Sequence, residues 1–200
     1  RGEGLFLHLD EATLSSWLQQ GATAEFNLQF YNAHRRWRTQ RGMQSPDAGY
    51  PGARFVLLHS LSHALMRQLV LECGYSAASI RERIYAREAD SPGGPMAGLL
   101  LYTAAPDSEG TLGGLVRLGR PAELGRHLDA ALSSMGLCAS DPLCAEHHPF
   151  EPRVTLHGAA CHACLFAPET SCEAGNRYLD RTILVPTVKH PERAFFALTT

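Results

Sequence analysis

The spacing of apolar residues predicts one long central helix. Between residues 55 and 73, apolar side chains, most of them leucine, recur every three or four positions, and Gly74 follows at a usual helix C-terminal position. We therefore expect an amphipathic helix over 55–73. Similar spacing predicts three more helices, over 10–21, 26–41 and 121–135.

Short apolar runs predict a small β-sheet. The runs 98–103 and 112–118 flank a turn-rich segment, so we expect them to form two paired strands. Residues 4–9 and 183–185 also have the composition of strands. Together with the helices, these runs predict an α+β fold in which a small sheet packs against several amphipathic helices.

The segment after the long helix is predicted to be a shorter helix. Ser76 is a suitable N-cap, and the cluster of Pro and Gly at 90–95 would end the helix after Tyr85 or Arg87.

Length and composition predict a single folded domain over residues 1–200. Apolar residues make up 44% of the 200-residue chain and charged residues 19%, which excludes the disordered and collagen-like classes. The formal net charge of −2 gives no overall attraction to a polyanion, so a nucleic-acid contact requires a local basic patch.

The chain carries no targeting or membrane signal that we can identify. It begins at Arg1 without a signal-peptide pattern, and no apolar run approaches the roughly 20 residues that span a bilayer. We expect a fragment of a larger protein that works in the cytoplasm and makes no membrane contact.

The cysteines indicate a metal site. Only Cys73 lies outside the segment 138–172, and such clustering favours metal ligation over a disulfide framework. The other five are Cys138, Cys144, Cys161, Cys164 and Cys172.

Four thiolates are expected to bind one structural zinc ion. Cys161 and Cys164 form a C-x2-C knuckle, and Cys172 follows in a turn-rich segment. We expect Cys144 as the fourth ligand, with Cys138 as the alternative. Such a site would make 138–181 a zinc-stapled loop region near the C-terminus, and four thiolates would leave no coordination position for a catalytic water. The alternative is that some of these residues are buried free cysteines.

The cysteine region carries a family resemblance. The run 159–173 resembles the signature of the zinc-binding domain at the C-terminus of MrfA-type DNA-repair helicases, and most strongly that of DrmB-type subunits of the DISARM anti-phage system. The segments 57–63, 107–115 and 141–144 are also similar to that family.

The resemblance implies an accessory role in anti-phage defence. It implies a helicase subunit as partner, support for the recognition of foreign DNA, and no catalytic residue in this domain. The chain has no Walker-type phosphate loop, so we expect ATP hydrolysis in the helicase partner.

Two other groups of residues suggest alternative functions. His59 and His63 stand at i and i+4, and with Asp107 and Glu109 they could form a metal-dependent hydrolase if they converged in a pocket. The simpler interpretation is that the histidines donate hydrogen bonds inside the fold and that the acidic residues form a turn between strands.

A basic helix suggests a nucleic-acid contact. Four arginines with one tryptophan suit a phosphate backbone and a stacked base, and a solvated helix face with Trp37 buried is an equally good interpretation. A third possibility is a pure protein-docking module, in which this helix docks onto the helicase partner. These residues are Arg35, Arg36, Trp37, Arg38 and Arg41.

Overall fold

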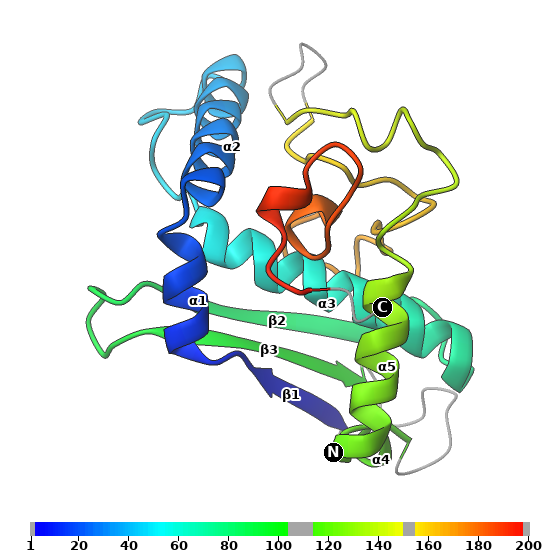
Figure 1. Cartoon of the computed structure of the whole chain (residues 1–200). Helices are drawn as coiled ribbons and strands as arrows, with labels where there is room; N and C mark the ends of the chain where they lie inside the picture. The colour runs from blue at the N-terminus through cyan, green and yellow to red at the C-terminus, as the bar shows by residue number, and fades with distance from the viewer. Residues whose placement is uncertain (1–2, 104–113, 150–154, 198–200) are drawn as a thin grey trace.

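A three-stranded antiparallel sheet lies along one side of the molecule (Figure 1). In this computed structural model, which describes residues 3–103, 114–149 and 155–197, the strands run in the order β1-β3-β2. Their bounds are β1 Gly4–His8, β2 Ile80–Arg87 and β3 Met96–Thr103. In the centre of the sheet, Leu99 of β3 pairs with Leu7 on one side and with Ile84 on the other.

Strand β2 replaces the helix that we predicted over 76–87. Ile80, Glu82 and Ile84 are buried while Arg81 and Arg83 are exposed, which is the two-residue alternation of a strand. The prediction of a helix was wrong because it relied on the N-cap character of Ser76 and overlooked this alternation.

The predicted pairing of 98–103 with 112–118 is also wrong. Strand β3 confirms the first run, but its partners are β1 and β2, and Gly114–Leu118 forms the short helix α4. Residues 104–113 lie outside the described part of the chain.

The apolar run at 183–185 is likewise not a strand. Asp180 accepts hydrogen bonds from the backbone N–H and the hydroxyl of Thr182, and this cap starts the 3-10 helix η1, Arg181–Ile183. A second 3-10 helix, η2, follows at Pro191–Arg193.

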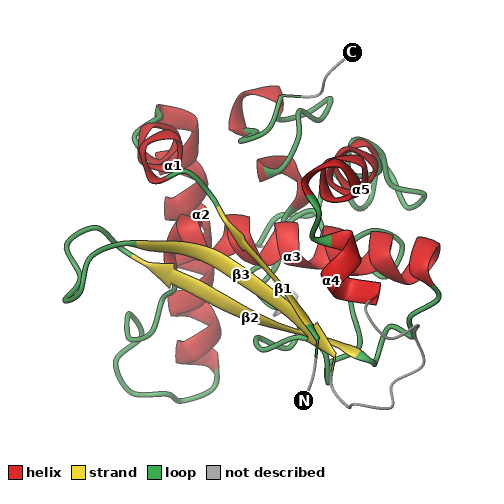
Figure 2. Ribbon diagram, turned by 90° about the horizontal axis from the view of Figure 1, so that it is seen from below, coloured by secondary structure: helices red, strands yellow, loops and turns green. Residues whose placement is uncertain are grey.

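The other four predicted helices are confirmed, and with them the α+β fold class. Figure 2 shows α1 and α2 at one end of the sheet and α5 at the other, with α3 running behind the strands. Their bounds are α1 Glu11–Leu18, α2 Gly21–Gln40, α3 Gly52–Cys73 and α5 Pro121–Ser133. None of the described helices is both long and apolar enough to cross a membrane.

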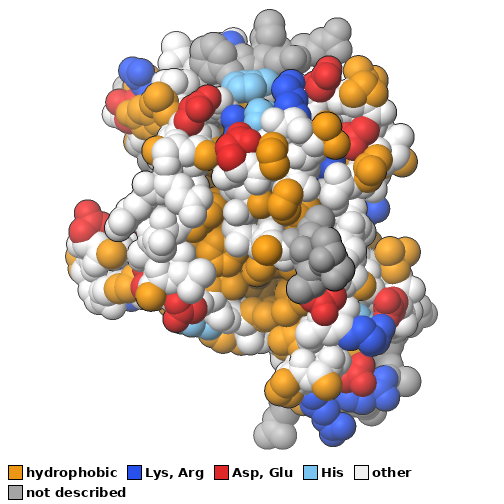
Figure 3. Space-filling model, in the orientation of Figure 1, with side chains coloured by type: hydrophobic (Ala, Val, Ile, Leu, Met, Phe, Trp, Pro, Cys, Tyr) orange, Lys and Arg blue, Asp and Glu red, His pale blue; other side chains and the backbone are white. Residues whose placement is uncertain are grey.

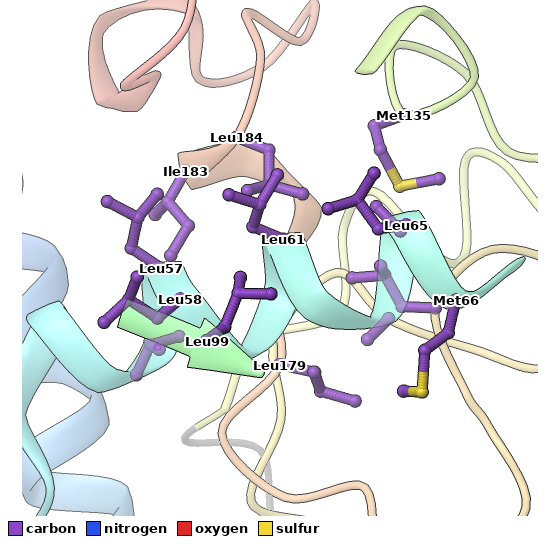
Figure 4. Close-up of a cluster of buried hydrophobic side chains, with 14 of the residues drawn as sticks. Leu57, Leu58, Leu61, Leu65, Met66, Leu99, Met135, Leu179, Ile183 and Leu184 are labelled. Carbon is purple, nitrogen blue, oxygen red and sulfur yellow. The ribbon is translucent and has the colours of Figure 1, made fainter. Parts of the chain in front are cut away.

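Helix α3 is buried on nearly all sides, because the sheet, α2 and α5 pack against it. The segment that follows α5 (138–149 and 155–197), called the C-terminal segment below, also covers it, with hydrogen bonds to His59, Ser60 and His63. Figure 4 shows Leu99 of the sheet below the helix, near Leu58, and Ile183 and Leu184 of the C-terminal segment above it, near Leu57 and Leu61. A helix that is covered in this way presents polar side chains to the protein interior as well as apolar ones. This placement decides the environment of His59 and His63.

Candidate metal centre

Four cysteines converge in the loop region after α5. Cys138, Cys144, Cys161 and Cys164 each offer a thiol, and the four sulfur atoms all lie within 4.8 Å of one another. Three of these cysteines are buried and Cys161 is half-buried. The structure therefore brings together three of the four ligands that we predicted, Cys144, Cys161 and Cys164, and adds Cys138, which we had considered as the alternative to Cys144.

The separations of the thiols suit a tetrahedral ion. Sγ of Cys161 lies 3.5 Å from Sγ of Cys138 and 3.7 Å from Sγ of Cys164, and Sγ of Cys164 lies 3.6 Å from that of Cys144. Four sulfurs at about 2.3 Å from a zinc ion stand about 3.8 Å apart in a tetrahedron. Because four protein ligands fill the shell, such a zinc ion has no place for a reacting water.

Polar groups around the thiols hold the loops in place. Backbone N–H groups of Ser140 and Cys161 point to sulfur, at 3.4 Å from Cys138 Sγ and 3.3 Å from Cys164 Sγ. Asp141 accepts hydrogen bonds from the backbone N–H groups of Cys138 and Ala145, at 2.8 and 3.0 Å, and so closes the turn that carries Cys138 and Cys144.

A buried arginine joins this turn to the core. The side chain of Arg181 is 1% exposed and donates to both carboxylate oxygens of Asp141, at 2.5 and 2.7 Å. It also donates to the carbonyl of Met135 at 2.9 Å. The roles of Asp141 and Arg181 were not predicted from the sequence, because the two residues are far apart in the chain.

Electrostatics favour the thiolate form at one member of the cluster, Cys144. A hydrogen bond from Cys164, with Arg181 nearby, lowers the pKa of the Cys144 thiol to about 6. The same hydrogen bond and burial raise the pKa of Cys164, and burial raises that of Cys138. Cys144 thus ionises more readily than Cys138 and Cys164, and a bound cation would favour the thiolate form of those two.

Cys172, which we had predicted as a zinc ligand, lies in a different cluster. The Cys172 thiol lies close to His59, His63 and Glu82, and not to the four clustered cysteines. The chain before Cys172 is held against the start of β2, because Ser171 donates to the carbonyl of Ala77 and accepts from the backbone of Glu82. Sequence spacing alone does not show this attachment.

The second cluster is built on regular secondary structure. His59 and His63 come from consecutive turns of α3, and Glu82 comes from β2. Glu82 Oε1 lies 2.9 Å from Nε2 of His59 and 3.3 Å from Nε2 of His63. Nε2 of His59 lies 3.2 Å from Sγ of Cys172. All four side chains are buried.

The four groups shift one another's ionisation. Burial disfavours protonation of His59, but the Glu82 carboxylate and the Cys172 thiol outweigh it and raise the pKa of His59 to about 10. Burial likewise opposes ionisation of Cys172, but hydrogen bonds from the two histidines lower its pKa to about 6. The same histidines hold the pKa of Glu82 well below its usual range against the effect of burial.

The hydrolase residues do not come together among the described residues. His59 and His63 are 0% exposed, so a substrate has no access to them. Asp107 and Glu109 lie outside the described part of the chain. The carboxylate that lies beside the two histidines is that of Glu82. Glu82 was missed because its segment was predicted to be a helix.

The basic residues at the end of α2 are exposed or half-buried, and several have local partners. Arg35 forms an ion pair with Asp47 at 2.6 Å, and Arg38 donates to the carbonyls of Gln44 and Ser45 in the following loop. The Arg41 guanidinium stacks on Trp37, with its central carbon 4.2 Å from the ring centroid.

A second group of arginines was not singled out from the sequence. Arg117, Arg120 and Arg126 line a surface cavity of about 520 Å³ beside α4 and α5. Figure 3 shows Lys and Arg side chains gathered at the lower end of the molecule, over these helices. Arg126 is paired there with Glu72 and Glu123.

The four-thiol cluster is the kind of centre that defines a structural zinc-binding domain. Residues 61–165 match the family model of the MrfA Zn-binding domain, which covers more than half of the chain. The chain therefore belongs to the MrfA Zn-binding domain family, and zinc is its cofactor. The matched segment contains all four clustered cysteines and ends one residue after Cys164, whereas Cys172 lies beyond it.

A relative with a longer chain is also similar. The chain is 39% identical over 196 residues to the DISARM protein DrmB of Bacillus paralicheniformis, an alignment that covers 98% of this chain and 33% of that protein. The chain thus spans about a third of the length of this relative. These findings confirm the resemblance that the residues had indicated.

Proposed function

We propose that this chain is a non-catalytic, zinc-binding accessory domain of a bacterial anti-phage defence protein of the DISARM type. In this proposal it works beside a DNA helicase subunit and supports the recognition of foreign DNA. The observation that carries the proposal is the closed four-thiol cluster, which lies wholly inside the segment that matches the family. The similarity to a DISARM protein along nearly the whole chain supports the place in defence.

The chemistry of the site favours a structural role. When bound, zinc supplies a cross-link between loops that otherwise have few regular hydrogen bonds, and four thiolates leave it no open position. Around it, Asp141 closes the turn of Cys138 and Cys144, and Arg181 holds that turn to the core. The hydrolase alternative is weaker, because His59 and His63 are buried beneath the C-terminal segment.

The surface beside the zinc knuckle favours contact with phosphates. A cavity of about 420 Å³ is lined by Trp37 and Arg41 of the α2 end together with His162, Phe166 and Arg177 of the cysteine region. The guanidinium of Arg177 lies 5.1 Å from the Trp37 ring centroid, and that of Arg41 lies 4.2 Å from it. Because these guanidinium groups already cover the Trp37 ring, we expect the two arginines to contact DNA phosphates in preference to stacking of a base on the ring.

The DNA contact is tested by the salt dependence of affinity. Replacing Arg41 and Arg177 together with Ala should weaken binding to all DNA sequences alike and flatten the slope of log affinity against log salt by about 0.7–0.9 for each phosphate that is no longer neutralised. Arg126→Ala is the matched control, because Arg126 lies in the other basic group and is paired with Glu72. An unchanged slope in the double variant would end the DNA-binding part of the proposal.

A protein-docking module is the second candidate function. Large apolar side chains are exposed around the cysteine region, with Leu137 76%, Leu143 80% and Val188 100% exposed. Figure 3 also shows hydrophobic side chains in the hollowed middle of one face, between α1 and α5. Binding to the helicase subunit that does not depend on salt, and that disappears when Leu137 and Leu143 are changed to Ser, would favour docking without DNA.

A further inference from the structure

Four buried groups in the core form a set of converging ligand atoms. His59 and His63 of α3, Glu82 of β2 and Cys172 of the C-terminal segment each direct one donor atom to a common point, and these atoms lie within 4.8 Å of one another. None of the four belongs to the four-thiol cluster. Two of them, His59 and Cys172, lie outside the segment that matches the family model.

Hydrogen bonds fix which nitrogen of each histidine faces the centre. His59 Nδ1 lies 3.2 Å from the carbonyl of Tyr178, and His63 Nδ1 lies 2.7 Å from the carbonyl of Leu165. A carbonyl only accepts, so each Nδ1 carries the hydrogen. In neutral histidine this leaves a lone pair on Nε2, directed at Glu82 and Cys172. Histidine that ligates a metal ion commonly has this arrangement, with its other nitrogen bound to a carbonyl.

Backbone N–H groups hold the remaining two ligands in position. The backbone N–H of Asn176 donates to Cys172 Sγ at 3.2 Å, and that of Glu173 donates to Glu82 Oε1 at 3.2 Å. The other carboxylate oxygen of Glu82 is buried and has no hydrogen-bond partner among the described residues. A buried carboxylate oxygen without a donor is costly, and a cation would satisfy it.

Four lone-pair donors that face one another need positive charge between them. That charge can be protons on the histidines, or it can be a divalent cation. We propose that His59, His63, Glu82 and Cys172 bind a second zinc ion. A Zn²⁺ ion with one thiolate, one carboxylate and two neutral imidazoles has no net charge, which suits a fully buried site.

The donor set selects zinc among the common cations. Nitrogen and sulfur ligands exclude Mg²⁺ and Ca²⁺, which prefer oxygen. A tetrahedral zinc ion with mixed ligands places them about 3.3–3.7 Å apart. The three separations of 2.9, 3.2 and 3.3 Å are within about 0.5 Å of that range, so small side-chain movements are sufficient.

The second zinc ion would have a different structural role from the first. It would tie the central helix and the sheet to the C-terminal segment, whereas the four-thiol site ties loops of that segment to one another. This role concerns how the domain is held together and does not depend on a function in defence.

The unmodified protein provides the first test. The folded 200-residue chain, purified without chelator from zinc-supplemented cells, should contain two zinc ions, counted by elemental analysis. X-ray absorption at the zinc edge should give about 2.5 sulfur ligands per zinc, because five thiolates would be shared between two ions. One zinc ion per folded chain with four sulfur ligands would overturn the proposal. His59, His63, Glu82 and Cys172 would then form a buried hydrogen-bonded network without a metal ion.

Variants assign the second ion to its ligands. Cys172→Ser should remove one zinc ion and leave the other with four sulfur ligands, and His162→Ala should keep both, since His162 is an exposed residue of the knuckle. If Cys172→Ser does not fold, Cys172→His keeps a zinc donor and should retain two ions with about two sulfur ligands per zinc. A zinc content that is the same in Cys172→Ser and in the unmodified chain would contradict the proposal.

Discussion

The two buried clusters differ in the part of the fold that positions their ligands. Cys138, Cys144, Cys161 and Cys164 lie on loops and turns within one stretch of the chain. His59, His63, Glu82 and Cys172 lie on a helix, a strand and a distant loop. The first cluster supports a region that has little other regular structure, whereas the second is supported by a core that is already packed. We therefore expect the loss of each cluster to have different consequences.

The clusters also differ in charge. Four thiolates around Zn²⁺ carry a formal charge of −2, and the buried guanidinium of Arg181 lies beside them. The cluster of His59, His63, Glu82 and Cys172 pairs its own anions with imidazole groups instead, and no arginine or lysine is among its members. The four-thiol cluster therefore depends for charge compensation on Arg181, a residue that is distant in sequence but close in space, and the other cluster has no such dependence.

The largest effect is expected from loss of the four-thiol site. Cys164→Ser, or a strong chelator, should unfold the region 138–181, because structural zinc contributes about 10–16 kcal/mol of apparent binding free energy to the fold that it supports. Hydrogen exchange should show that amide protection disappears in this region and persists in α3 and β3. Full protection of 138–181 in a zinc-free protein would show that the loops do not need the metal.

The next effect concerns the buried carboxylate of the second cluster. Glu82→Gln should lower the free energy of unfolding by about 3–5 kcal/mol, because it removes one partner from a fully buried set of charged groups. Urea denaturation measures this change, and the cooperative loss of the whole domain would distinguish it from the local loss in Cys164→Ser. Glu169→Gln is the control, since Glu169 is exposed on the loop that leads to Cys172. Equal stability of the two variants would contradict the burial argument.

A smaller effect is expected at the link between the four-thiol cluster and the core. Arg181→Met should lower the free energy of unfolding by about 1.5–3 kcal/mol, because it removes charge-assisted hydrogen bonds to Asp141, whose side chain is still 19% exposed to water. A double-mutant cycle with Asp141→Asn should show coupling between the two residues. Additive effects would mean that the ion pair does not hold the loop.

The smallest effect is expected at the histidine inside the knuckle. His162 lies between the two knuckle cysteines but is exposed, so His162→Ala should change the free energy of unfolding by less than about 0.5 kcal/mol. His63→Ala, which removes a histidine with 0% exposure, should be far more destabilising in the same thermal unfolding experiment. Similar melting temperatures for the two variants would contradict the expectation that buried His63 stabilises the fold and exposed His162 does not.

The sequence by itself determined the features that depend on neighbouring residues. Apolar residues three and four positions apart make α3 and α5 helical, because each turn of a helix repeats after 3.6 residues. The knuckle of Cys161 and Cys164 is also local, since its spacing alone lets two thiols reach one ion. These elements required no knowledge of what they pack against.

Only the tertiary structure decided which distant residues meet. The choice between Cys138 and Cys172 depends on where the chain goes after Cys164, and contacts of Ser171 with the start of β2 direct Cys172 to the histidines of α3. Glu82 reaches the same point because β2 pairs with β3 and turns that side chain towards α3. Such meetings follow from the packing of the sheet, the central helix and the C-terminal segment, and the spacing of residues along the chain does not specify that packing.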